Sequence, residues 1–193
     1  MQRNGCVYFS DSLKEIPNGA FSYQTDLHAT IFNNTCTVRI IGDSYFRGSG
    51  LREIEIPSSV VTICDQAFRD CASLRRVTFP RNSRLETIGD ICFCKSGLVE
   101  LETPQGLRHI GAGAFKDCHD LQRVTLNEGV ESLEDGVFKN SGLEEIELPS
   151  TLRDMSGNAF WNCDGLHVVW VNDRRVFNMV RSALDYRIKV RQK

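Results

Sequence analysis

A short pattern that recurs seven times constrains the fold of this chain of 193 residues more than any other feature. Each copy places a phenylalanine five residues after an aliphatic residue or methionine, as in "IGAGAF" from Ile110 to Phe115. The seven phenylalanines lie at intervals of 22 to 25 residues: Phe21, Phe46, Phe68, Phe93, Phe115, Phe138 and Phe160. A repeat of this length indicates a solenoid, in which each copy forms one coil and buries its apolar side against its neighbours.

The second half of each copy predicts a short β-strand. In "LREIEIP" (51–57) and "LEEIELP" (143–149), apolar and polar residues alternate with the period of two that a half-buried strand requires. One strand per coil, always in the same direction, predicts a parallel sheet, with a turn or a short helical segment before each leucine. Besides the phenylalanines, the predicted buried residues are Leu51, Leu74, Leu98, Leu121, Leu143, Leu166, Ile54, Val77, Leu101, Val124 and Ile146.

Cysteine and serine alternate at the position three residues after the phenylalanine, which reveals a double repeat of about 45 residues. The two sets are Cys71, Cys118 and Cys163, and Ser49, Ser96 and Ser141. Cysteines two coils apart are separated by ~9.6 Å, beyond the ~7 Å Cα separation that a disulfide tolerates. We therefore expect these three cysteines to be packing residues, and the eight cysteines of the chain to be free thiols of a reduced compartment.

The unit "IGAGAFKDCHDLQRVTLNEGVES", with "AFxxCxxLxxVxL" at its centre, resembles the BspA-type leucine-rich repeat, and the resemblance covers residues 7–172. It implies an α/β-type repeat solenoid: a right-handed superhelix with a concave parallel β-sheet and short turns or helical segments on the convex side. It also implies a surface for binding proteins, and many bacterial and protist members resemble surface or secreted adhesins. The family has no shared catalytic residues to transfer. Asn33, Asn127 and Asn172 stand where other coils end their strand with proline.

The predicted organisation is one leucine-rich-repeat solenoid at 1–172 and a basic C-terminal cap at 173–193. The solenoid starts with a half-coil at 7–15, and its repeats start near residues 16, 41, 63, 88, 110, 133 and 155. The cap has seven Lys or Arg and two Asp, a net charge of +5, whereas the rest of the chain carries −7. Its "YRIKVRQK" alternates like a strand, so its charges either protect a sheet edge from aggregation or form a small patch for nucleic acid or an anionic surface.

The residues that alternate with the buried ones point out of the sheet and form two columns along the stack. In the first column acidic and basic residues alternate, which predicts charge pairing between neighbouring strands. In the second column only threonines separate the glutamates. The face has six Glu and two Arg and is acidic, so we expect it to bind a protein partner that has a basic segment. The candidate partner-binding residues are Glu53, Glu55, Arg76, Glu100, Glu102, Arg123, Glu145, Glu147 and Trp170.

The two ends of these columns are apolar, with Ala29 and Ile31 at one end and Val168 and Trp170 at the other. Terminal coils of a solenoid need covering. The segment "RRVFNMVRSAL" (174–184) has apolar residues at helical spacing, so it is expected either to fold back over Trp170 or to leave this side chain as an interface anchor.

Charge and composition argue against several classes of function. A net charge of −2 argues against nucleic acid as a partner of the whole chain, and no stretch has the 18 apolar residues of a membrane span. The chain shows no signal peptide, which favours an intracellular location, or a secreted or cell-surface one if it is a fragment of a longer precursor. Catalytic, cofactor-binding and metal-binding residues are not predicted. The expected function is a non-catalytic protein–protein interaction scaffold; the alternative is an adhesin-like or self-assembling module that associates through its apolar ends.

Overall fold

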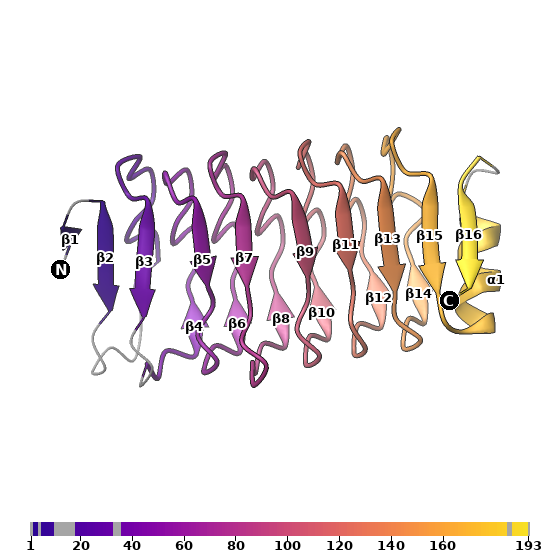
Figure 1. Ribbon diagram of the computed structural model, residues 1–193, viewed down its shortest axis with the longest axis horizontal. Coiled ribbons are helices and arrows are strands. Elements are labelled where there is room, and N and C mark those ends of the chain that lie inside the picture. Colours follow the sequence, from indigo (N-terminus) through magenta and orange to yellow (C-terminus); the bar gives the residue numbers. More distant parts are fainter. Residues whose placement is uncertain (1, 4, 10–17, 33–35, 185–186, 193) are drawn as a thin grey trace.

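The computed structural model describes residues 2–3, 5–9, 18–32, 36–184 and 187–192, which form one elongated stack of coils (Figure 1). The predicted repeat start near residue 16, the strand-end residue Asn33 and most of the predicted half-coil 7–15 lie outside the described residues. The described chain begins with the two-residue strand β1 (Gln2–Arg3), which pairs antiparallel with the next strand.

One strand of each coil joins a row along one side of the stack, which we call the long row (Figure 1). Its strands pair in parallel within three hydrogen-bonded sheets, β2 with β3, β5 with β7, and β9 through β16, and this confirms the predicted parallel arrangement. The strands of the long row are β2 (Cys6–Phe9), β3 (Ala29–Phe32), β5 (Glu53–Glu55), β7 (Arg76–Thr78), β9 (Glu100–Glu102), β11 (Arg123–Thr125), β13 (Glu145–Leu148), β15 (Val168–Val171) and β16 (Lys189–Gln192).

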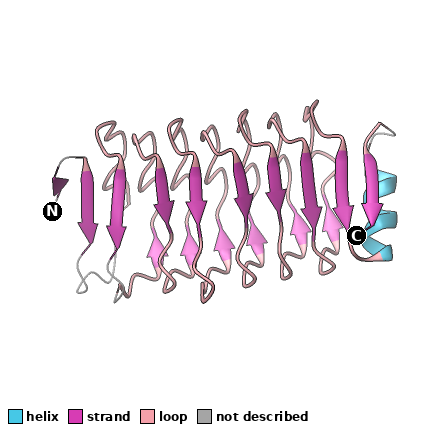
Figure 2. Ribbon diagram, viewed as in Figure 1, coloured by secondary structure: helices cyan, strands magenta, loops and turns pink. Residues whose placement is uncertain are grey.

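A second row of two-residue strands lies behind the long row and was not predicted from the sequence (Figure 2). These strands also pair in parallel, as two sheets, β4 through β10 and β12 with β14. They are β4 (Ile40–Ile41), β6 (Thr62–Ile63), β8 (Thr87–Ile88), β10 (His109–Ile110), β12 (Ser132–Leu133) and β14 (Asp154–Met155). Each ends on the aliphatic residue or methionine that precedes a phenylalanine of the repeat, and turns make the remaining connections of the described coils.

A column of stacked phenylalanine rings fills the core between the two rows. From Phe46 to Phe160, neighbouring ring centroids are 5.0 to 5.6 Å apart and the ring planes are within 16° of parallel. The predicted leucines and strand residues are all buried, and only Phe21, at the N-terminal end, is partly exposed. The ring spacing is close to the ~4.8 Å separation of paired strands, so side-chain stacking and backbone pairing favour the same distance between coils.

Serine–cysteine pairs explain the double repeat. The Cys118 thiol donates to the Phe93 carbonyl oxygen across 3.0 Å, and its sulfur lies 3.4 Å from the Ser96 hydroxyl. The same arrangement recurs for Cys71 with Ser49 and for Cys163 with Ser141. Because an unpaired buried hydroxyl is costly, each buried serine needs a cysteine in the next coil. The eight cysteines are free thiols, as predicted.

Helix α1 (Arg174–Ala183) follows the last coil and is the only helix among the described residues. It starts at Asp173, whose carboxylate accepts from the backbone N–H groups of Arg175 and Val176, an N-cap. Val176 and Val180, which the sequence places at helical spacing, are fully buried. Strand β16 then pairs with β15, so the end of the core is closed by the helix and the end of the long row by β16.

Replacing a ring in the middle of the column tests how much the stacked phenylalanines stabilise the fold. Phe115→Ala is expected to lower the free energy of unfolding by about 3–5 kcal/mol, because it leaves a cavity between two stacked rings. Urea denaturation followed by circular dichroism measures this change. Phe21→Ala, at the partly exposed end, is the matched control and should cost less. Equal losses in the two variants would contradict a stabilising role for the interior stack.

The buried thiols predict a loss of stability in alkali. Burial raises the pKa of Cys118 to about 12 in the folded protein, from an ordinary value near 9. Between these two values the unfolded chain releases the thiol proton and the folded protein keeps it, so the free energy of unfolding falls as pH rises above about 9. Cys118→Ser removes this titration and should therefore show a shallower decline.

Urea titrations at pH 8 and pH 10.5 measure the effect. The decline for the original chain should exceed that for Cys118→Ser by up to about 2 kcal/mol, from 1.36 kcal/mol per pKa unit. The comparison at pH 8, where both side chains are neutral, separates this effect from the packing cost of the substitution. Parallel declines would show that the thiol ionises equally well in the folded state.

Candidate functional site

Strand alternation places the candidate residues on the outer face of the long row, which we define as the side turned away from the core. In β9, Leu101 is buried while Glu100 and Glu102 on either side of it are exposed. Strands β5 and β7 show the same exposed–buried–exposed pattern. The nine candidates lie in β5 (Glu53, Glu55), β7 (Arg76), β9 (Glu100, Glu102), β11 (Arg123), β13 (Glu145, Glu147) and β15 (Trp170).

The register brings the first column together as the sequence predicts. Arg123 is the direct neighbour of Glu100 on one side and of Glu145 on the other. In the N-terminal half, Arg76 lies opposite Glu53. Acidic and basic residues therefore alternate along the outer face from β5 to β13.

These opposite charges do not form ion pairs with one another. Of the ion pairs among the described residues, none joins two members of the first column; they include Arg47 with Asp70 and Arg153 with Glu131. The predicted pairing is thus limited to alignment in register. Arg76 and Glu100 stay exposed, so their charged groups are accessible to a partner.

An open pocket lies over the middle of this face, above β7, β9 and β11. Its charged lining residues are Arg76, Arg81, Glu100, Glu102 and Arg123. Residues of the turns after the strands, including Asn127, also line it. The candidate residues of three neighbouring coils therefore share a single concavity.

Asn127 connects two of these coils at a strand end that lacks proline. Its backbone N–H donates to the Thr103 hydroxyl across 3.0 Å, and its side-chain amide donates to the Thr103 carbonyl oxygen and to Glu102. The amide thus also contacts the Glu102 carboxylate beside the pocket. The sequence marks Asn127 only as a position without proline and gives no sign of this contact.

Trp170 closes the candidate surface toward the C-terminus. Its indole N–H donates to the Glu145 carboxylate across 3.4 Å, and the Arg191 guanidinium lies over its ring at 5.6 Å. Arg191 comes from β16, which also pairs Lys189 beside Val168. Val168, expected to be exposed, is buried because β16 adds this further strand. The outer face therefore continues past Trp170 into basic residues.

The N-terminal end of the outer face is apolar. Tyr8 of β2 and Ile31 of β3 are direct neighbours in the register, and their exposed fractions are 50% and 45%. Their position continues the second column beyond Glu55. The two ends of this face thus differ, with an apolar pair at one end and Trp170 with Arg191 at the other.

The described residues contain no group of three His, Cys, Asp or Glu side chains close enough to hold a metal ion. No described helix has the length and apolar character of a transmembrane span.

Comparison with known proteins identifies the repeat. The model of a family described as "BspA type Leucine rich repeat region" matches residues 39–167 in six copies. The crystal structure of a leucine-rich repeat protein of T. pallidum is 30% identical, with a TM-score of 0.76, over 94% of this chain and 84% of that one. A leucine-rich repeat protein from Bacteroides ovatus has the same fold, with 17% identity and a TM-score of 0.56 over 98% of this chain and 66% of that one. The search of curated proteins found no significant match.

Proposed function

The chain belongs to the BspA type leucine-rich repeat family, and we propose that it is a non-catalytic protein-binding module whose partner docks on the outer face of the long row. The observation that carries this proposal is the row of charged side chains on the outer face from β5 to β13, whose first column contains no ion pair among the described residues; a pocket over β7, β9 and β11 opens in this face. An open sheet lined with accessible charges suits a macromolecular partner, whereas catalysis requires an enclosed site.

The sign of the charge defines the partner chemistry. Strands β5 to β13 present six Glu and two Arg on the outer face, a net charge of −4. A basic segment complements this potential and is drawn to it at long range. The partner that fits is therefore a protein with a lysine- or arginine-containing segment.

The spacing of the second column defines the shape of this segment. Glu55, Glu102 and Glu147 lie on alternate coils, so neighbours are ~9.6 Å apart along the stack. A polyproline II helix has three residues per turn and rises ~9.3 Å per turn. Basic residues at every third position of such a segment would face successive glutamates, and the segment would run along the stack across the strands.

A charge-reversal experiment tests this assignment. Fluorescence anisotropy is measured with a labelled proline-rich peptide that has lysine at every third position. Glu102→Lys combined with Glu147→Lys should weaken binding about tenfold at low salt, because two favourable surface charge contacts of up to about 1 kcal/mol each are lost. Glu102 is exposed and Glu147 is half-buried, and neither belongs to the core, so circular dichroism should show an unchanged fold.

The matched control is Glu131→Lys combined with Asp154→Lys, which makes the same change of net charge beside the second row. It should bind the peptide within twofold of the original chain. Equal weakening in both double variants would reduce the effect to overall charge and exclude the outer face as the site.

The alternative function is self-association through the apolar end formed by Tyr8 and Ile31. Light scattering of the free chain separates the two functions in the same samples. A constant monomer mass across concentration supports the binding module, and a mass that increases with concentration supports self-association.

A further inference from the structure

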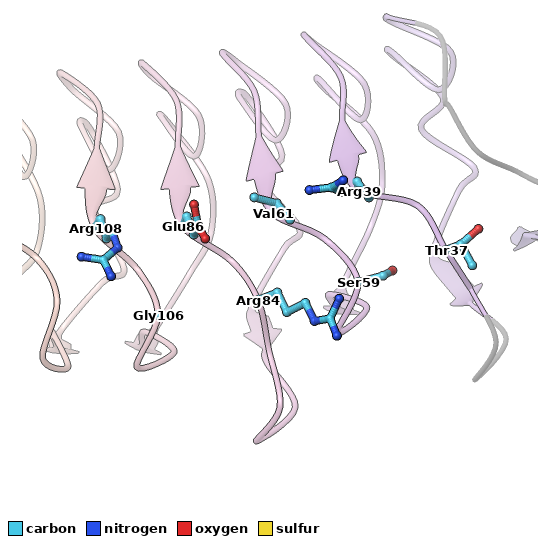
Figure 3. Close-up of a pocket in the computed structure, with 8 residues that line it drawn as sticks. All are labelled: Thr37, Arg39, Ser59, Val61, Arg84, Glu86, Gly106 and Arg108. Carbon is cyan, nitrogen blue, oxygen red and sulfur yellow. The ribbon is translucent and has the colours of Figure 1, made fainter.

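A second pocket lies on the other side of the stack, beside strands β4, β6, β8 and β10 (Figure 3). We call it the arginine groove, because Arg39, Arg84 and Arg108 line it together with Glu86, Ser59 and Val61. None of these residues belongs to the outer face of the long row. The groove is therefore independent of the surface assigned above.

The repeat itself builds this groove. Arg39, Val61, Glu86 and Arg108 each stand immediately before a strand of the second row, so they form one column across four coils. Arg84 lies two residues before Glu86, and its side chain extends toward Ser59 of the neighbouring coil (Figure 3). Arg84 and Arg39 thus flank Val61, while Arg108 lies at the far end beyond Glu86.

The three guanidinium groups have no partner among the described residues. Other arginines are engaged: Arg47 pairs with Asp70, Arg75 with Asp120, and Arg153 with Glu131. The side chains of Arg39, Arg84 and Arg108 are exposed and take part in no hydrogen bond or ion pair within the described chain. Three Arg against one Glu give the groove a net charge of +2.

Two backbone N–H groups and one hydroxyl of the groove already donate hydrogen bonds within the chain. The Glu86 N–H donates to the Val61 carbonyl oxygen across 2.9 Å, and the Arg108 N–H donates to the Glu86 carbonyl oxygen across 2.9 Å. The Ser59 hydroxyl donates to the Val38 carbonyl oxygen across 2.7 Å. Recognition at this site therefore depends on the guanidinium groups, which bind carboxylates with paired N–H donors.

The length of the groove selects the ligand. Arg39 and Arg108 stand three coils apart, ~14 Å along the stack, which is too far for both to contact one small oxyanion. Four residues of an extended peptide span ~13–14 Å, and residues i and i+4 then point to the same side. The negative charge of Glu86, next to Arg108 in the column, disfavours an acidic residue in the middle of the ligand.

We propose that the arginine groove binds an extended acidic peptide segment of a partner protein. Acidic side chains at the two ends of a five-residue stretch point to one edge of the extended segment and meet Arg39 and Arg108 in the column. A second acidic residue next to the first points to the opposite edge and meets Arg84, which lies to the side of that column. The residue that faces Glu86 is neutral or basic. The solenoid would then carry two sites of opposite charge on different sides, one for a basic segment and one for an acidic segment.

The test uses a labelled peptide with glutamate at positions 1, 2 and 5 and threonine at positions 3 and 4, followed by fluorescence anisotropy at low salt. Arg39→Gln combined with Arg108→Gln should weaken binding about tenfold, and Arg84→Gln alone about threefold, as expected for exposed ion pairs. A peptide with glutamine in place of the three glutamates should not bind.

The matched control is Arg52→Gln combined with Arg181→Gln, which removes two exposed arginines that lie outside the groove. Binding within twofold of the original chain supports the assignment. An equal loss in this control, or unchanged binding in Arg39→Gln with Arg108→Gln, would overturn it. Displacement of the peptide by micromolar inorganic phosphate would also overturn it, because it would identify a small-anion site. Failure of the basic peptide to bind the outer face leaves this test unaffected.

Discussion

The separation between neighbouring coils is the constraint on which the rest of this solenoid depends. Parallel strands pair ~4.8 Å apart, and the phenylalanine rings stack with centroids 5.0 to 5.6 Å apart. Each position that one coil exposes therefore recurs one spacing away along the stack. A single outward side chain per coil becomes a continuous column, so the geometry of the core sets the spacing of the exposed columns.

Core and surface also share a two-coil period. Inside, a buried serine in one coil is satisfied by a cysteine in the next, as with Ser96 and Cys118. Outside, the same alternation places Arg123 between Glu100 and Glu145. A polar atom in the core requires a partner at a fixed distance, and this requirement keeps the two kinds of coil in strict order. The order of the exposed charges follows the same alternation.

The sequence predicts those parts of the fold that repeat in every coil. The burial of Leu101 and the exposure of Glu100 and Glu102 follow from alternation within one strand, and Val176 and Val180 follow from helical spacing. The two-residue strands of the second row are too short to create a periodic signal. The contact of Trp170 with Arg191 depends on where β16 pairs, which the repeat pattern does not predict. The residues of the arginine groove align only when the coils are stacked, because most of them stand immediately before the short strands of the second row.

We propose that a basic protein segment contacts the charged outer face of the long row. Nuclear magnetic resonance of the isotope-labelled chain, titrated with the proline-rich lysine peptide, tests it most directly. Amide shifts should change along β5 to β13 and concentrate around Glu102, where the pocket lies. Shift changes confined to helix α1 or to the second row, or none at saturating peptide, would contradict it.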